Sequence, residues 1–189
     1  MKKIITCLLT LSMMFMFSAT AFASDFSGNA ESELSNISDK IVTAVNDVYS
    51  DKNISITAED INYDSAFKIY VDTNVFKLST NVVGEIENAL ENGNYIYLLP
   101  IDTVNGTVVV NFQKGLPLSE NAKAILSEEE QQEVLDNAGK WVISSLALYK
   151  NGNSNYDYEK KLSSIIDEIP ADTILVGGLP IFQDVVALI

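Results

Sequence analysis

Apolar residues recur every three or four positions in the stretch that begins at Ala30. The positions with this spacing are Leu34, Ile37, Ile41, Val45 and Val48. Such a repeat is typical of an α-helix with one apolar face and one polar face. The pattern predicts an amphipathic helix over residues 30–50, followed by a turn at 51–53.

The spacing of apolar residues then shortens to two, which is typical of strands with one buried face. Residues 54–56 form a short alternating run, and residues 67–71 form a clearer one. The sequence between them is polar and turn-like. These two runs predict the strands of a first hairpin.

A second hairpin has the strongest local signal. The β-rich runs 95–101 and 107–112 flank Asn105-Gly106, a pair that tolerates positive φ at both central positions of a tight turn. Pro100 has no backbone N–H for a ladder, so we expect it beside a sheet edge or a bulge. The three consecutive valines at 108–110 predict a strand that is covered on both faces.

Further helices are predicted on either side of this hairpin, one of them over residues 81–92. A short helical piece at 119–126 leads to Ser127, which forms a capping-box sequence with Glu130. The helix behind this box is predicted to continue to Lys150 with Trp141 in the core. Its inward side would carry Val134, Ala138, Trp141, Val142, Ser145, Leu148 and Tyr149.

The last part of the chain predicts a helix near 158–166 that ends before Pro170, and then a buried strand at 173–176. Residues 181–189 are mostly apolar and stop at Ile189 without a polar exit. Two interpretations remain open for this tail. It is a strand within the sheet, or the natural protein continues beyond Ile189.

Helical and hairpin patterns occupy separate stretches, which favours an α+β fold over a parallel α/β sheet. We predict an antiparallel sheet covered by amphipathic helices, built from two helix-hairpin units at 30–72 and 81–113. No Pro-rich or Gly/Ser-rich linker divides residues 30–189, which predicts a single domain. Residues 24–29 are expected to form a flexible arm in front of it.

The first 23 residues have the order of a secretory signal peptide. Lys2 and Lys3 precede an apolar run that ends at Phe17, and small residues then lead to Ala21-Phe22-Ala23. We predict cleavage after Ala23 and a secreted, extracellular protein with no membrane anchor in its mature form. The apolar run is shorter than an ordinary membrane span.

Composition narrows the chemistry of the mature chain. Its one cysteine, Cys7, lies in the signal peptide, and the chain has no histidine and no arginine. Without the two signal-peptide lysines, ten lysines face 26 acids, so the mature net charge is −16. Such a chain repels phosphate backbones, which argues against nucleic acid as a partner. Abundant Asn, Ile and Lys without Arg are typical of a bacterial chain.

The missing residue types exclude Ser-His-Asp and Cys-His catalysis and zinc sites with His or Cys ligands. Paired carboxylates that hydrolyse glycosides remain possible. The acids in predicted loops or near strand ends are Asp60, Asp64, Asp72 and Asp102. Solvated surface acids and turn formers are the simpler explanation of their presence, so we assign no catalytic residue.

No cofactor-binding or metal-binding residue is assigned either. Calcium is the most reasonable metal for this composition, because it takes oxygen ligands and needs neither His nor Cys. Residues 151–159 alternate oxygen-bearing side chains, but the glycine of an EF-hand loop is replaced by Tyr158 and its twelfth position by Ser164. A polar loop between helices is the simpler interpretation.

Tyrosines suggest a binding surface. Tyr95 and Tyr97 share one face of a predicted strand, and Tyr70 lies on another strand. Exposed together, they would form a platform for a sugar or a peptide, since tyrosine combines a flat apolar ring with a polar tip. Packing beneath the helices is the alternative, and it is the simpler interpretation for each tyrosine.

These observations favour a binding protein over an enzyme. We expect a non-enzymatic extracellular module whose partner is a protein or a glycan. The alternative is a carboxylate-dependent, glycosidase-like hydrolase that acts on extracellular or cell-wall polysaccharide.

Overall fold

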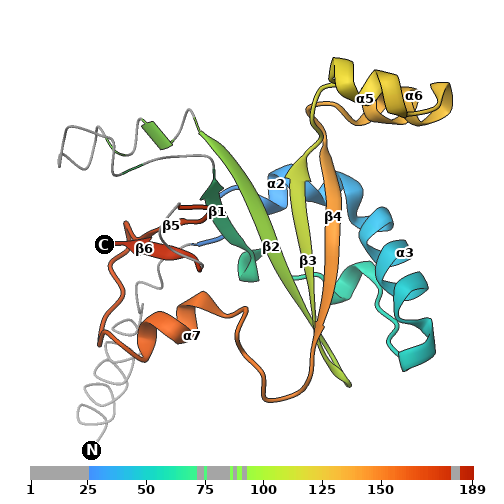
Figure 1. Ribbon diagram of the computed structural model, residues 1–189. Helices are drawn as coiled ribbons and strands as arrows, with labels where there is room; N and C mark the ends of the chain where they lie inside the picture. Colours follow the sequence, from blue (N-terminus) through green and yellow to red (C-terminus); the bar gives the residue numbers. More distant parts are fainter. Residues whose placement is uncertain (1–25, 72–74, 76–85, 87–88, 91–92, 180–183) are drawn as a thin grey trace, which may run out of the picture.

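The protein forms one six-stranded sheet with helices, an α+β fold in a single domain (Figure 1). The structure is a computed structural model, which describes residues 26–71, 75, 86, 89–90, 93–179 and 184–189. The strands are β1 (Phe67–Val71), β2 (Asn94–Thr103), β3 (Gly106–Lys114), β4 (Trp141–Tyr149), β5 (Ile174–Val176) and β6 (Val186–Leu188).

Strand order in the sheet is β4-β3-β2-β1-β5-β6. Neighbouring strands are antiparallel except for β1 and β5, which run parallel with Ile69 opposite Leu175. The predicted antiparallel sheet is therefore correct for most of the ladder, and one parallel pair joins its two halves.

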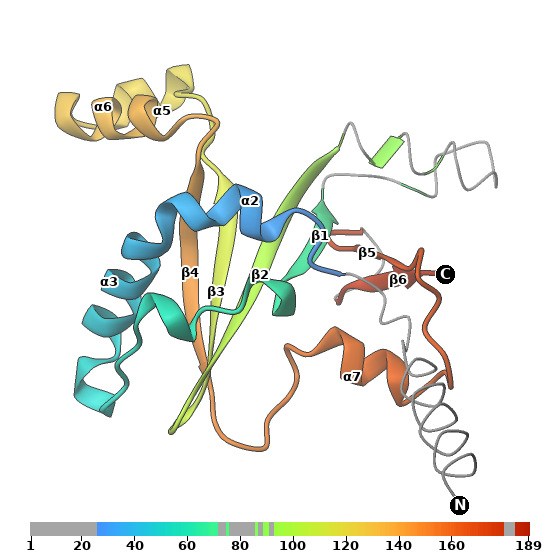
Figure 2. The same ribbon diagram turned by 180° about the vertical axis from the view of Figure 1, so that it is seen from behind.

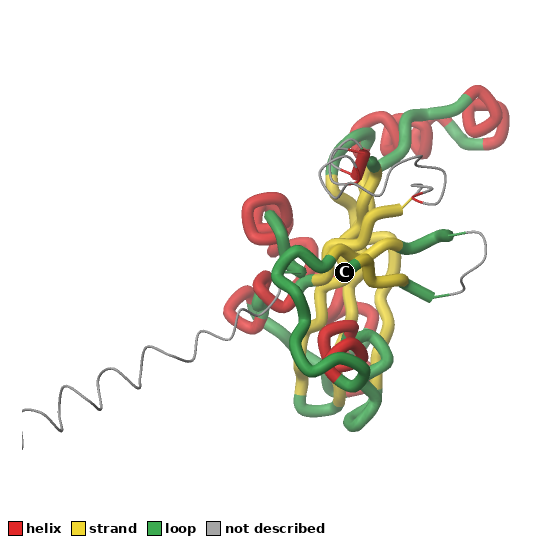
Figure 3. The backbone as a smooth tube through the Cα atoms, turned by 90° about the vertical axis from the view of Figure 1, so that its left-hand side faces the viewer, coloured by secondary structure: helices red, strands yellow, loops and turns green. Residues whose placement is uncertain are grey.

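Two helices replace the single helix predicted at 30–50. The chain forms α2 (Ala30–Leu34), a 3₁₀ turn (Ser35–Ile37) and α3 (Ser38–Val48). The predicted stripe faces the core at Leu34, Ile41 and Val45, which are completely buried, but its last member, Val48, is 55% exposed. Figure 2 shows α2 and α3 in front of β3 and β4, and Figure 3 shows the strands as a layer with helices beside it.

The sheet has two apolar faces. Under α2 and α3, alternate residues of β2 and β3 are buried: Tyr97, Leu99, Ile101, Val108, Val110 and Phe112. We call this the α2/α3 face. On the opposite face, Phe67 and Ile69 of β1 pack with Tyr158 and Leu162 of α7 (Tyr158–Ser163). We call this the α7 face.

The β2–β3 hairpin confirms the second predicted hairpin, with its tip one residue earlier than expected. Thr103 pairs with Gly106, so Val104 and Asn105 occupy the two central positions. Gly106 has φ +139°, and a Cβ there would collide with the carbonyl oxygen of Tyr149 on β4. Glycine is therefore required by the neighbouring strand as well as by the turn.

Both further expectations for this hairpin are confirmed. Val108, Val109 and Val110 are all buried, as a strand covered on both faces requires. Pro100 lies beyond the end of the β1–β2 ladder, which stops at Leu98. Its carbonyl oxygen accepts a hydrogen bond from Ser65 Oγ at 3.3 Å, while Pro100 itself pairs with Val109 of β3.

The strand predicted at 54–56 is wrong. Ile54 and Ile56 are buried, but the backbone there is bonded by a side chain from α3. Asn46 Oδ1 accepts from the Ile56 N–H at 2.8 Å, and Asn46 Nδ2 donates to the Ile56 carbonyl at 3.0 Å. This amide takes the place of a partner strand, so the first of the two predicted helix-hairpin units does not form.

The long helix predicted to end at Lys150 is also wrong in its second half. α6 (Glu128–Asn137) begins at the predicted capping box, but it stops before Gly139, which has φ +73°. The chain then enters β4, which supplies the outer partner of β3. Trp141 consequently lies on a strand, half-buried against the core.

The C-terminal predictions hold better. α7 and β5 occupy the expected positions, and the apolar tail contributes β6 beside β5.

Residues 26–27, expected in a flexible arm, are buried, and the Phe26 carbonyl accepts from the Lys68 N–H at 2.8 Å. The predicted signal peptide and most of the predicted helix at 81–92 lie outside the described residues. Within the described ranges, no helix is long and apolar enough to cross a bilayer.

Candidate functional site

The three tyrosines singled out from the sequence lie together on the α2/α3 face. Tyr70 on β1 is directly opposite Tyr95 on β2, and their ring centroids are 5.9 Å apart. Tyr97 is two residues along β2, with its ring 5.6 Å from that of Tyr95. Tyr97 is completely buried, whereas Tyr70 and Tyr95 are half-buried.

Two residues from other elements complete this group, which we call the tyrosine cluster. Trp141 on β4 lies 5.5 Å from the Tyr95 ring and 5.1 Å from the Tyr97 ring. Glu33 of α2 accepts hydrogen bonds from Tyr95 Oη at 2.9 Å and from Trp141 Nε1 at 2.9 Å. Tyr97 Oη donates to the same carboxylate at 3.4 Å. One carboxylate thus joins three aromatic side chains to α2.

Burial and the Glu33 charge keep these phenols protonated. Burial is the main cause that raises the pKa of Tyr95 to about 12, and the hydrogen bond and charge of Glu33 add to it. The pKa of Tyr97 is raised further, again mainly by burial. Both hydroxyls therefore remain donors to Glu33 over the ordinary pH range.

Two lysines lie against the cluster. Lys68 Nζ is 4.1 Å from the centre of the Tyr95 ring and 5.1 Å from that of Tyr70. Lys114 Nζ is 5.0 Å from Tyr95 and 5.3 Å from Trp141. Cation–π attraction explains both positions. Neither ammonium has a carboxylate within salt-bridge distance in the described part of the chain.

A cavity of about 390 Å³ opens beside Lys68 and Tyr70. Its other lining residues are Phe26, Gly28, Leu90, Ala171, Asp172, Thr173, Ile174 and Leu175. Gly28 has φ +55°, and a Cβ there would lie 3.1 Å from Lys68 Cδ. The glycine therefore lets the N-terminal segment approach the lysine stem at the cavity wall.

The cavity offers mixed chemistry. Lys68 is a hydrogen-bond donor, the exposed Asp172 carboxylate is an acceptor, and Tyr70 supplies a ring. Thr173 is buried, and its hydroxyl donates to the Pro170 carbonyl at 2.7 Å. Of the three predicted tyrosines, Tyr70 alone lines this cavity, while Tyr97 belongs to the core.

Sequence reasoning missed Glu33, Lys68 and Trp141 as neighbours of the tyrosines. The position of Lys68 beside the tyrosines could have been predicted from the sequence. Residues two apart on a strand share a face, and Lys68 precedes Tyr70 by two. Trp141 gave no such signal, since its stretch was expected to be helical.

The acids considered for hydrolysis are dispersed. Asp60 Oδ2 accepts from the Thr57 backbone N–H at 2.7 Å, and this bond lowers the pKa of Asp60, the opposite of what a general acid needs. Asp64 is exposed, and Asp72 lies outside the described residues. Asp102 lines a hollow of about 200 Å³ together with Tyr156, Asp157 and Glu159.

The loop considered for calcium uses its oxygens locally. Asn153 Oδ1 accepts from the Asn155 N–H at 3.0 Å, and Asp157 Oδ1 caps α7 by accepting from the Lys160 N–H at 2.9 Å. The described residues contain no group of three or more acidic, histidine or cysteine side chains that could hold a metal ion.

Comparisons with models of protein families, with curated proteins and with solved structures found no match to this chain.

Proposed function

We propose that this chain is a secreted, non-enzymatic bacterial binding module, and that the cavity beside Lys68 and Tyr70 receives its ligand. The observation that carries the proposal is an ammonium group that has no carboxylate partner among the described residues and is held over two tyrosine rings at a cavity. The absence of His, Arg and Cys from the mature sequence supports binding over catalysis.

The cavity chemistry favours an uncharged, hydroxyl-rich ligand, which outside a bacterial cell means a glycan. Sugar hydroxyls both donate and accept, so they can use Lys68 and Asp172 together, while a sugar ring packs on Tyr70. Acidic polysaccharides fit less well, because the net charge of −14 on the whole chain repels them.

Calorimetric titration with neutral oligosaccharides of several linkages tests this proposal, with oligogalacturonate as the acidic comparison. We expect Lys68→Met and Tyr70→Leu each to weaken binding about tenfold, since each removes one main contact. Lys114→Met is the matched control, because Lys114 also contacts Tyr95 but does not line the cavity. Equal affinity of all three variants would exclude this cavity as the site.

One observation favours a second function, a carboxylate-dependent hydrolase. Asp102, Asp157 and Glu159 line one hollow together with Tyr156, and paired-carboxylate chemistry uses two acids that face a common cleft. Asp102 Oδ1 already accepts from Thr107 Oγ1 at 2.7 Å, and Asp157 caps α7, so both have structural roles. Turnover of a polysaccharide that is abolished by Asp102→Asn or Glu159→Gln would establish this function and displace the first.

A further inference from the structure

The segment between β3 and β4 projects beyond the end of the sheet. It contains α5 (Glu120–Ile125) and α6, and we call residues 115–140 the α5–α6 arm (Figures 1 and 2). Its two ends are joined at the base, where the Gly115 N–H donates to the Lys140 carbonyl at 2.9 Å and the Gly139 N–H to the Gly115 carbonyl at 2.8 Å. No residue of α5 or α6 is buried.

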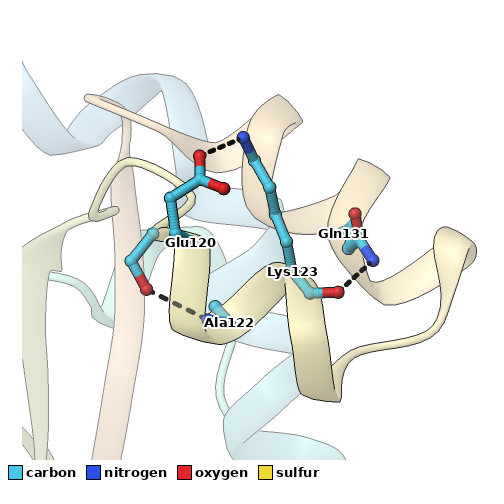
Figure 4. A network of polar contacts seen from close by, with 5 residues as sticks. Glu120, Ala122, Lys123 and Gln131 are labelled. Atoms are coloured by element: carbon cyan, nitrogen blue, oxygen red, sulfur yellow. Dashed lines mark hydrogen bonds and ion pairs between the residues drawn. The ribbon is translucent and has the colours of Figure 1, made fainter.

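Polar contacts, rather than a core, define the shape of the arm. Ser127 and Glu130 form the capping box of α6, and Gln131 Nε2 donates to the carbonyls of Lys123 at 3.0 Å and Leu126 at 2.8 Å. Figure 4 shows Gln131 reaching the end of α5 beside the Lys123–Glu120 ion pair. Helices this short are marginal alone, so these bonds present one defined surface.

An apolar hollow of about 440 Å³ lies at the root of the arm. Its apolar lining consists of Leu116, Pro117, Leu118, Ala122, Val134 and Val142. Leu116 is 74% exposed, and Ile125 farther out is 83% exposed. Apolar side chains concentrated on a projecting element mark an interaction site when they lie beside a hollow that can receive a partner.

The charge of the arm identifies the kind of partner. Residues 120–137 carry six acids and one lysine, a net charge of −5 in 18 residues. The whole chain has −14 in 189 residues, so residues 120–137 are several times more acidic per residue than the chain as a whole. The lysine of this stretch, Lys123, is already paired with Glu120 at 2.7 Å, and Glu133 lines the hollow.

We infer that the α5–α6 arm docks a cationic, amphipathic segment of another protein. Apolar side chains of that segment enter the hollow beside Leu116, and its lysines or arginines face Glu133 and the acids of α6. A second copy of this chain does not fit, because two arms of the same charge repel each other. This site is separate from the glycan cavity and does not depend on it.

Amide chemical shifts of the ¹⁵N-labelled protein test the inference with three synthetic peptides of equal length. One peptide combines Leu with Lys on two helix faces, one combines Leu with Glu, and one combines Ser with Lys. We expect the Leu/Lys peptide to shift amides within residues 115–142 and to bind at least about tenfold more tightly than the other two. Its affinity should fall as salt is added.

Matched variants separate the apolar and the charged contributions. Leu116→Ser should weaken the Leu/Lys peptide about tenfold, and Val104→Ser, which changes an equally exposed apolar residue on the hairpin tip, should not. The pair Glu129→Lys, Glu133→Lys should weaken it similarly, whereas Glu31→Lys, Asp39→Lys on α2 and α3 should not. These variants change exposed residues, so the fold is retained.

Three results would overturn the inference. The first is peptide-induced shifts spread over all acidic surfaces, and the second is equal binding by the Ser/Lys peptide. The third is concentration-dependent dimerisation in analytical ultracentrifugation that Leu116→Ser abolishes, because the hollow would then belong to a second copy. Loss of glycan binding in Lys68→Met with unchanged peptide binding leaves this inference intact.

Discussion

Glu33 is the acceptor on which the tyrosine cluster depends, and replacing it gives the most direct test of the structure. In Glu33→Ala, the N–H of Trp141 and the hydroxyls of Tyr95 and Tyr97 lose their common acceptor. Hydrogen bonds to a charged group contribute about 1.5–3 kcal/mol each, and less where water can replace them. Tyr95 and Trp141 are only half-buried, and the Tyr97 bond is long, so we expect a total loss of about 3 kcal/mol.

Glu33→Gln should cost less, about 1–2 kcal/mol, because the amide keeps one oxygen acceptor. The NH₂ group of the glutamine side chain can donate to a tyrosine hydroxyl, but this NH₂ group cannot accept a hydrogen bond from the indole N–H of Trp141. Glu31→Ala is the matched control, since Glu31 is an exposed acid in the same first turn of α2. We expect that variant to change stability by no more than about 0.5 kcal/mol.

The free energy of unfolding of all three variants is measured in urea, with far-UV circular dichroism and tryptophan fluorescence as the two probes. Trp141 is the single tryptophan of the chain, so its emission reports on the cluster itself. A Glu33→Ala protein as stable as the Glu31→Ala protein, with unchanged emission, would refute the role assigned to this carboxylate.

Three further results are expected. Gly106→Ala should destabilise the protein by more than about 2 kcal/mol in urea unfolding, because the new methyl group collides with the Tyr149 carbonyl. Gly152 also has a positive φ, +86°, but has open space around it, so Gly152→Ala should cost only about 1 kcal/mol. The pKa of Tyr95 is about 12 in the folded protein and 10.0 ordinarily, so its protonated hydroxyl stabilises the fold fully below pH 10. This stabilisation is lost as the pH rises to 12, and the free energy of unfolding, measured in urea across this pH range, should decline accordingly. Ser127→Ala should remove the cap of α6 at a cost of about 1 kcal/mol, seen as lost helical dichroism with little change in tryptophan emission, since α6 has no buried residue.

Local signals predicted those parts of the fold that local interactions determine. The capping box at Ser127 marks the start of α6, and the valines at 108–110 identify a strand covered on both faces. The apolar stripe of α2 and α3 could be predicted from its spacing, because three of its residues fill the core and must therefore be apolar. The 3₁₀ turn between the helices does not alter which side is apolar.

The error at β4 has a physical cause in a β-bulge. Asn111 pairs with Ser145 and Phe112 with Ile143, so Ser144 is an extra residue in β4. Core-facing residues before and after the bulge are therefore separated by three positions instead of two. The apolar pattern of this strand then resembles the repeat of a helix, and only Gly139 indicated that α6 ends before Trp141.

The candidate site was predicted in part, for a related reason. Alternation along a strand places Tyr95 and Tyr97 on one face, but the partner of each strand is set by tertiary pairing. Glu33 reaches the tyrosines from α2, at a sequence distance of more than 60 residues. No spacing rule within one element can reveal such a contact.

The parallel pairing of β1 with β5 has a consequence for how this chain folds. Ile69 on β1 can pair with Leu175 on β5 only after all of β2, β3 and β4 have been synthesised between them. Loop closure over such a distance is slow, so the sheet cannot be completed on a nascent chain that still lacks its last strands. The sheet would therefore stay incomplete until β5 and β6 have been synthesised, and the pairing of these two strands would be the step that commits the chain to its native state.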